Sequence, residues 1–265
     1  MNNVIILIPH FNNFSGLCTS VFSIEKDEKV DVLIVDDGSF ESTINEMQLL
    51  KNKNFKGSIY FIYNEINKGI EHVLNQGLKF ILKKEVYKYI ARLDCGDLCL
   101  DNRFYLQEKY LNDHIQCKLV GSNAIAIDTN GKELYKTILP ENSNIIKNKM
   151  YLNAMFLHPT VMFCSSIIKE IGYYPTEYKA AEDYAFFFKI AQKYETHNIQ
   201  KFLLKYEINT NGISLSKRNL QVSSRIKVIK DNFYFGFWPI YGLLRNYALR
   251  YLIPQKIINW IKTNK

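Results

Sequence analysis

The stretch IARLDCGDLC, residues 90–99, ends an apolar run in two carboxylates, Asp94 and Asp97, with Gly96 between them. A buried strand has no use for charges at its tip, because an unpaired charge there is costly. Carboxylate oxygens at such a tip can hold a metal ion and, with it, a phosphate group. A calcium-like surface loop and a helix that begins at Asp97 are the alternatives. The EF-hand pattern is not met, because its later spaced acids and terminal Glu are missing.

These carboxylates need a scaffold, and the first hundred residues suggest one. Short apolar runs alternate there with stretches of helical spacing, a pattern that predicts a doubly wound sheet of buried parallel strands. The runs occupy residues 4–9, 30–37, 58–64 and 87–94, and the helices expected between them residues 15–26, 40–53 and 69–84. In such sheets ligands bind beyond the carboxyl ends of the strands.

Polar side chains follow each of these four runs, so the predicted fold would bring them to one crevice. They are His10 and Asn12, Asp36 and Asp37, Asn64 and Asn67, and Asp94 and Asp97. Four strand ends that converge indicate a binding site more strongly than any one motif does.

The alternation weakens after residue 104. We expect a strand at 117–128 with an Asn-Gly hairpin after it, a helix within 140–155, a strand at 157–163, a short helix ending at Gly172 and a helix that opens at Glu182. No linker precedes about residue 215. The expected organisation is one domain over 1–215, with halves 1–104 and 105–215, and a basic helical extension over 216–265.

Composition narrows the class of protein. A formal net charge of +8 favours binding to nucleic acid, to an anionic membrane or to a phosphorylated substrate, but the sequence contains no recognised nucleic-acid-binding motif. Five cysteines without a C-x-x-C pair or a secretory signal predict reduced thiols in the cytoplasm. The uncharged run 232–244 is too short to span a bilayer. The basic amphipathic segment after it lies either in a membrane interface or against its own domain.

An ordered set of motifs over about residues 1–190 resembles family 2 of the glycosyltransferases. The motifs are IPHFN at 8–12, VDDGS at 35–39, NKGI at 67–70, RLDCGD at 92–97, HPTVMF at 158–163 and AEDYAF at 181–186. The resemblance implies the GT-A fold, an α/β architecture with a Rossmann-like, mostly parallel central sheet flanked by helices and here a C-terminal helical tail. It also implies a nucleotide-sugar donor.

The resemblance assigns the nucleotide to the first three motifs. It places Asp36 and Asp37 beside the base and ribose, whose N–H and O–H groups a carboxylate can accept. The other nucleotide-binding candidates are Pro9, Phe11, Asn12, Asn67, Lys68 and Gly69. Alternatives are an Asx turn at VDDGS, a core role for Phe11 and a helix cap at Asn67.

For RLDCGD the resemblance implies one Mn²⁺ or Mg²⁺ ion on Asp97, with Asp94 as the first acid of the motif. Many relatives read D-x-D-D at this place, whereas this chain has Gly96 in third position. The departure leaves one ribose contact without its carboxylate.

The resemblance assigns catalysis to AEDYAF, with Asp183 as the base that takes the acceptor proton. Glu182 would orient the acceptor or raise the pKa of Asp183 through like charge. The alternative is that both acids simply complement the helix dipole. His158 would lie near the acceptor or the leaving phosphate, and Lys217 with Arg218 near the diphosphate. A structural histidine and a mobile basic loop are the competing interpretations.

The implied activity is inverting transfer of a hexose or N-acetylhexosamine from a nucleotide sugar, expected to be UDP-linked, to a hydroxyl of a growing surface glycan. Such a glycan would be a lipooligosaccharide, a capsule or an O-antigen on a lipid carrier. The enzyme would work in the cytoplasm, in peripheral contact with the inner face of the membrane. A nucleotidyltransferase and an inactive nucleotide- or glycan-binding module of the same fold remain the rival hypotheses.

Overall fold

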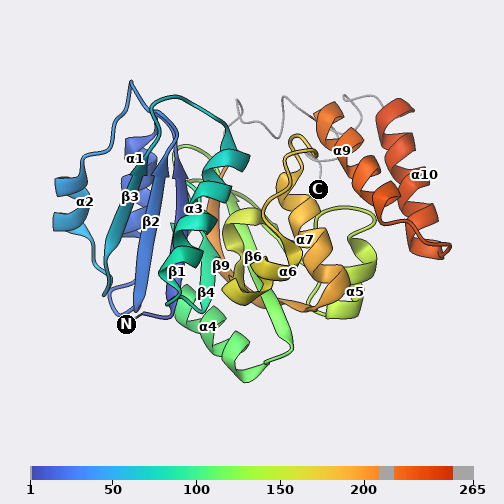
Figure 1. Ribbon diagram of the computed structural model, residues 1–265, viewed down its shortest axis with the longest axis horizontal. Coiled ribbons are helices and arrows are strands. Elements are labelled where there is room, and N and C mark those ends of the chain that lie inside the picture. Colours follow the sequence, from blue (N-terminus) through green and yellow to red (C-terminus); the bar gives the residue numbers. More distant parts are fainter. Residues whose placement is uncertain (1, 209–217, 253–265) are drawn as a thin grey trace.

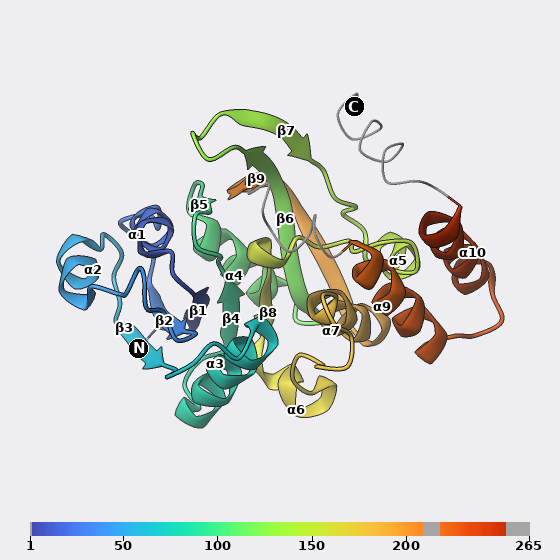
Figure 2. The ribbon, with the colours of Figure 1, turned by 90° about the horizontal axis from the view of Figure 1, so that it is seen from above.

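The computed structural model describes residues 2–208 and 218–252, in which one nine-stranded sheet carries helices on both sides (Figure 1). Four strands of the first half run parallel in the order β3-β2-β1-β4, and nearly every residue of β1 and β2 is buried. These strands and the helices between them are β1 (Val4–His10), α1 (Phe14–Phe22), β2 (Val30–Asp36), α2 (Glu46–Asn52), β3 (Ile59–Tyr63), α3 (Ile70–Lys84) and β4 (Tyr89–Arg92). Figure 2 shows α1 and α3 on opposite sides of these strands.

The second half continues the same sheet with mixed strand directions. The pairs β4–β8, β8–β6, β6–β7 and β9–β5 are antiparallel, and β6–β9 is parallel. The predicted α/β sheet is therefore uniformly parallel only in its first half, and the second half mixes antiparallel pairs with the parallel pair β6–β9. The remaining elements are β5 (Leu98–Cys99), α4 (Arg103–Asp113), β6 (Cys117–Ile127), β7 (Glu133–Thr137), α5 (Ser143–Lys149), η1 (His158–Thr160), β8 (Met162–Cys164), η2 (Ser165–Ile167), α6 (Ile168–Ile171), α7 (Glu182–Lys193), β9 (Glu195–Glu207), α9 (Arg218–Asp231) and α10 (Phe237–Tyr251).

Three predicted elements differ in their extent. The helix expected over 40–53 begins only at Glu46, because the N–H groups of Phe40 and Glu41 bond to Asn12 and the side chain of Asn45 caps α2. The strand expected over 157–163 starts as the single turn η1, because Pro159 has no N–H to give to a sheet. The helix expected within 140–155 is only α5.

The C-terminal helices α9 and α10 lie at the end of the molecule opposite α2 (Figure 1). They pack on each other and on the second half: Tyr178 donates to Asp231 at 2.7 Å, and Arg245 donates to the carbonyl of Leu152 at 2.7 Å. Residues 218–252 are thus a docked helical pair. Within the described residues no helix is both long and apolar enough to cross a membrane. The tail from residue 253 lies outside them.

Candidate active site

His10, Asp36 and Ser39 form a closed cluster where β1 and β2 end. His10 Nδ1 lies 2.6 Å from Asp36 Oδ1, and Ser39 donates to the two oxygens of Asp36 through its hydroxyl at 2.5 Å and its N–H at 3.0 Å. The Asn13 N–H donates to His10 Nε2 at 3.2 Å, so the ring proton belongs on Nδ1, facing Asp36. Both side chains are buried. The Asp36 carboxylate therefore ties two loops together beneath the predicted nucleotide site.

Asp37 fixes the loop that leads into α3. Its carboxylate accepts the N–H groups of Lys68 and Gly69, each at 2.9 Å. Gly38, at φ 76°, lies so close to this loop that a Cβ atom would stand 2.6 Å from the carbonyl carbon of Ile66. VDDG is thus more than a turn, because it clamps the loop that carries three predicted nucleotide-binding residues.

The NKGI loop presents its polar side chains at the surface. Asn67 and Lys68 are exposed, and Gly69 is the N-cap residue of α3, with φ 93° and no side-chain cap. The alternative prediction that Asn67 caps the helix is therefore wrong. Its side chain and that of Lys68 stay available to a ligand beyond the strand ends.

Phe11 and Asn12 follow β1 directly, and only Asn12 uses its side chain to hold the protein together. Asn12, at φ 47°, accepts the N–H groups of Phe40 and Glu41 through Oδ1 at 2.9 and 3.0 Å, so its side chain is committed to the protein. Phe11 is exposed and meets the ring of Phe40, which is 73% exposed, edge-on at 6.4 Å. Two rings with free faces can stack on a nucleotide base. The sequence analysis missed Phe40, and its position directly after VDDGS was the available signal.

Pro9 lies half-buried between these two motifs. Its carbonyl oxygen accepts the thiol of Cys95 at 3.3 Å. Pro9 therefore joins the end of β1 to the acidic turn through its backbone.

Arg92 is the buried centre of the acidic motif, and the sequence analysis gave it no role. Its guanidinium donates to Asp94 Oδ1 at 2.5 Å, to the carbonyl of Leu7 and to His158 Nε2 at 3.1 Å. The Asp94 side chain remains 40% exposed, so it balances the buried cation and still reaches the open side of the sheet. Only the fold brings these partners together.

His158 belongs to the same network. Its Nε2 accepts from Arg92 and from the hydroxyl of Tyr174, which lies 3.0 Å away. Burial, and then the charge of Arg92, hold the pKa of His158 well below its usual value. The ring is therefore neutral and its Nε2 is already occupied. This geometry favours the structural interpretation of His158 over contact with the acceptor.

Asp97 is buried where the acidic turn meets β9. Its Oδ1 accepts the Glu207 N–H at 3.0 Å, and the N–H of Gly96, at φ 100°, bonds to the Gly16 carbonyl and to Ser20 Oγ. Burial, followed by the charge of Asp94, raises the pKa of Asp97 well above its usual value. These backbone contacts fix the turn, and within it the carboxylates of Asp94 and Asp97 repel each other.

A divalent cation fits this pair of carboxylates. Within residues 2–208 and 218–252 no three potential ligands from His, Cys, Asp and Glu converge as a preformed cage. Mg²⁺ does not require such a cage, because it takes one or two carboxylates and completes its shell with phosphate oxygens and water. Asp97 and Asp94 supply that number of hard ligands.

Glu182 and Asp183 are the first two residues of α7. Glu182 is 8% exposed, and its Oε2 has no hydrogen-bond partner within the described chain. Burial, and then the charge of Asp183, raise the pKa of Glu182 to about 7. A buried acceptor without a donor is costly, and Glu182 Oε2 can accept a hydrogen bond from a ligand.

Asp183 is half-buried, and its Oδ1 accepts the Tyr184 N–H at 2.6 Å. Burial raises the pKa of Asp183, and the charge of Asp94 adds to the rise, while the Tyr184 N–H and the charge of Arg225 oppose it. Asp94 and Asp183 therefore lie within electrostatic reach of each other, although they come from motifs far apart in the chain.

The structure describes only part of the two predicted diphosphate contacts, Lys217 and Arg218. Lys217 lies outside the described residues, and Arg218 begins α9 with its side chain outside them.

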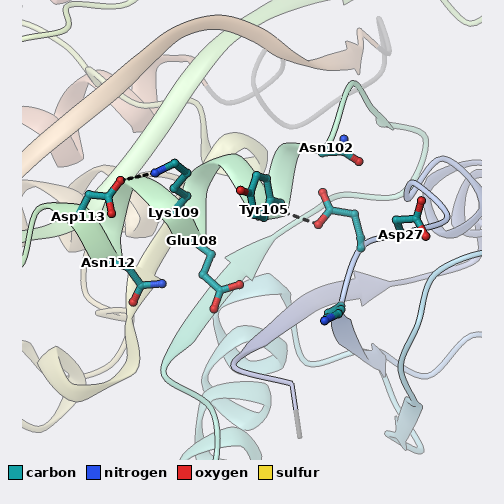
Figure 3. Close-up of a pocket in the computed structure, with 9 residues that line it drawn as sticks. Asp27, Asn102, Tyr105, Glu108, Lys109, Asn112 and Asp113 are labelled. Carbon is teal, nitrogen blue, oxygen red and sulfur yellow. Dashed lines mark hydrogen bonds and ion pairs between the residues drawn. The ribbon is translucent and has the colours of Figure 1, made fainter.

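A hollow of about 650 Å³ lies between α4 and the loop before β2, away from the motifs described above (Figure 3). Its lining mixes both signs of charge, including Asp27, Lys109 and Asp113. Glu28 there caps α4 by accepting the N–H groups of Phe104 and Tyr105. The hollow contains none of the predicted site residues.

The glycosyl transferase family 2 model matches residues 5–172, a stretch that contains every motif described above except AEDYAF. The chain belongs to glycosyl transferase family 2. An uncharacterized glycosyltransferase of Methanocaldococcus jannaschii is 33% identical over 162 residues, which are 60% of this chain and 54% of that protein. The amylovoran biosynthesis glycosyltransferase AmsE of Erwinia amylovora is 27% identical over 74% of this chain and 73% of its own. The chain spans only about half the length of the archaeal relative.

Solved structures of glycosyltransferases share the fold of this family 2 chain. TarS of S. aureus, residues 1–349 in complex with UDP, superposes with a TM-score of 0.64 at 16% identity, over 99% of this chain and 79% of that one. The mannosyltransferase PcManGT of Pyrobaculum calidifontis, in complex with GDP-Man and Mn²⁺, gives a TM-score of 0.62 at 15% identity, over 94% and 69%. These likenesses establish the predicted GT-A fold.

Proposed function

We propose that the protein is an inverting, metal-dependent glycosyltransferase that moves a hexose or N-acetylhexosamine from a nucleoside diphosphate sugar to a hydroxyl of a growing glycan. One observation carries the proposal: Glu182, in the predicted base motif, has a buried Oε2 without a hydrogen-bond partner in the described chain, and after burial and the charge of Asp183 the charge of Asp94, from the predicted donor motif, also reaches it. The two motifs therefore face one space, as transfer between two bound substrates requires.

The donor would lie across the carboxyl ends of β1 to β4. Phe11 and Phe40 offer exposed ring faces to the base, and Lys68 offers a cation to the phosphates. TarS was solved with UDP and UDP-GlcNAc, and PcManGT with GDP-Man, which supports a nucleotide sugar. We propose UDP as the nucleotide, with a guanine nucleotide as the competitor that the binding experiment must test.

Asp97, with Asp94, would hold the divalent ion. Mn²⁺ in the PcManGT structure supports a metal of this kind. When bound, the ion would neutralise the charge that develops on the departing diphosphate. Asp97 is fixed for that task by its bond to the Glu207 N–H, and Asp94 by its bond to Arg92.

Asp183 would act as the base. The acceptor oxygen attacks the anomeric carbon as its proton passes to Asp183, and the bond from that carbon to the diphosphate oxygen breaks in the same displacement. Attack from the face opposite the leaving group inverts the anomeric configuration. Glu182 would accept a second acceptor hydroxyl through its unpartnered Oε2 and so orient the sugar.

The acceptor would be a lipid-linked surface glycan at the cytoplasmic face of the membrane. AmsE acts in amylovoran biosynthesis, which supports a polysaccharide product. The segment between α9 and α10 carries Phe235, which is 93% exposed, and the α10 side chains Phe237 and Leu244 are also exposed. Together with the net charge of +8, these side chains suit an anionic bilayer surface.

Calorimetry with UDP and GDP, with and without Mn²⁺, tests the donor site on the wild type and on Asp97→Asn. We expect UDP to bind more tightly with Mn²⁺ and Asp97→Asn to lose that gain, whereas Asp113→Asn, at an exposed ion pair on α4, keeps it. Release of UDP from UDP-sugars then identifies a transferase. Release of pyrophosphate from UTP and a sugar 1-phosphate would identify a nucleotidyltransferase, and binding without turnover on any acceptor would leave the inactive module.

A further inference from the structure

Gly96 leaves a gap in the acidic turn, and the side chain of Glu207 fills it. A Cβ atom built on Gly96 would lie 3.2 Å from Glu207 Oε2 and 3.5 Å from its Cδ. The carboxylate of Glu207 thus lies where a side chain at position 96 would begin. The gap and the carboxylate come from parts of the chain more than a hundred residues apart.

The sheet holds Glu207 in this place. Leu98 and Cys99 of β5 pair with Lys205 and Leu204 of β9, which brings the end of β9 beside the acidic turn. The Glu207 N–H then donates to Asp97 Oδ1 at 3.0 Å. The backbone of Glu207 is therefore fixed on both sides, and its half-buried side chain has little freedom to leave the turn.

The Glu207 carboxylate has no positively charged partner among the ion pairs of the described residues. It lies beside the carboxylate of Asp97, whose Oδ1 accepts the Glu207 N–H. Like charges at this distance repel, so the arrangement favours a ligand that brings hydrogen-bond donors.

We propose that Glu207 supplies the carboxylate that this chain lacks at position 96, and that it accepts hydrogen bonds from the ribose hydroxyls of the donor nucleotide. The inference rests on the proposed function, because it concerns the same donor site. A ribose is favoured over a second metal contact, since Asp94, Asp97 and Glu207 do not converge as a three-ligand cluster in the described chain. Two vicinal O–H donors match the two oxygens of one carboxylate.

The test compares the affinity for UDP with that for 2′-deoxy-UDP and 3′-deoxy-UDP, at constant Mn²⁺, by calorimetry. GDP and its deoxy analogues replace them if the protein prefers guanine. A hydrogen bond to a charged group is worth about tenfold or more in affinity, so the wild type should bind at least one deoxy analogue about tenfold more weakly. Glu207→Gln should bind UDP and that analogue within about threefold of each other.

Glu195→Gln is the matched control, because Glu195 lies on the same strand at its other, exposed end. It should discriminate as the wild type does. Thermal denaturation of each variant checks that the fold is kept. Gly96→Asp combined with Glu207→Gln provides the second variant: a restored discrimination in that pair, absent in Glu207→Gln alone, would show that the two positions serve one contact.

The outcomes separate the inference from the function. If the wild type binds UDP and Glu207→Gln keeps the full preference for the ribose hydroxyls, the inference is overturned and the proposed function stands. If Glu207→Gln keeps that preference but loses the Mn²⁺ effect, Glu207 serves the metal and the ribose role is equally overturned. If the wild type binds no nucleotide, the proposed function itself fails.

Discussion

At the scale of single residues, the fold brings the charge of Asp94 near Glu182 and Asp183, which lie far from it in the chain. Glu182 combines a buried, unpartnered oxygen with a pKa of about 7, and Asp183 next to it also titrates above its usual range. A base works in its deprotonated form, so transfer should rise with pH through the pKa of Asp183 and fall in acid.

Asp183→Asn should lower kcat by about a hundredfold or more, because general base catalysis contributes that much. The affinity for UDP with Mn²⁺ should stay unchanged, since Asp183 does not contact the donor in the proposal. Initial rates and calorimetry on the same preparation check both parts. Substantial residual kcat would remove Asp183 from the role of base.

Glu182→Gln replaces a buried carboxylate with a neutral amide and so removes the charge whose burial is costly. It should therefore stabilise the fold in alkali. The folded-state pKa of Glu182, about 7, lies above the unfolded value, so the buried carboxylate costs nothing below the unfolded pKa, its cost grows as the pH rises from that value to about 7, and the full cost remains above it. Melting temperatures of the variant and the wild type should therefore agree at pH 4 and diverge by several degrees at pH 8. An unchanged difference across this range would contradict the interpretation.

At the scale of elements, a clamp between β2 and α3 decides how the donor loop is held. Asp37 binds the N–H groups of Lys68 and Gly69, and Gly38 lets the loop approach. Loop and strand end therefore move as one unit.

Gly38→Ala should break that clamp, because its Cβ would stand 2.6 Å from backbone atoms and its φ is 76°. Gly131→Ala is the control: its φ is similar at 80°, but its Cβ would meet nothing within 4 Å. Backbone strain alone costs about 1 kcal/mol, so Gly38→Ala should lose clearly more stability than Gly131→Ala and should also weaken UDP binding. Urea denaturation and calorimetry measure the two effects. Equal losses in the two variants would show that the close approach is unimportant.

At the scale of the whole molecule, the basic residues of α9 and the exposed aromatic residues of α10 and of the segment before it lie at the end opposite α2 (Figure 1). A membrane would thus meet a part of the protein remote from the strands that form the nucleotide half.

Phe235→Asp should reduce binding to vesicles of phosphatidylglycerol and phosphatidylcholine by several-fold, because it places a charge where an exposed ring would enter the interface. Phe40→Asp changes an exposed ring in the nucleotide half and should leave binding unchanged. Flotation at low and high salt measures both, and binding should weaken with salt. Equal behaviour of the two variants would place the contact elsewhere.

The parallel first half of the sheet was predictable because its strands are buried on both faces and so read as continuous apolar runs, as in Val4–His10, whereas the GT-A fold was predicted from the resemblance to family 2. The strand Glu195–Glu207 was not foreseen, because its buried positions are interrupted by exposed residues where its pairing with β6 shifts register. The sequence placed the polar residues correctly at the strand ends. The Asx-turn alternative describes Asp36, which accepts the Ser39 N–H three residues later. The sequence did not reveal that Asp37 and Asn12 accept N–H groups of other loops, nor that Arg92 joins Leu7 to His158, because those partners are distant in the chain.

The pairing of β4 with β8 has a consequence for anyone who wishes to build chimeric enzymes from this family. Cutting at residue 104 would separate β4 from β8 and β5 from β9. It would expose an apolar strand edge that promotes aggregation. Donor and acceptor preferences therefore cannot be exchanged as modules at that point. A graft that changes the acceptor should replace loops and helices around α7 and leave every strand of the sheet in its original partnership.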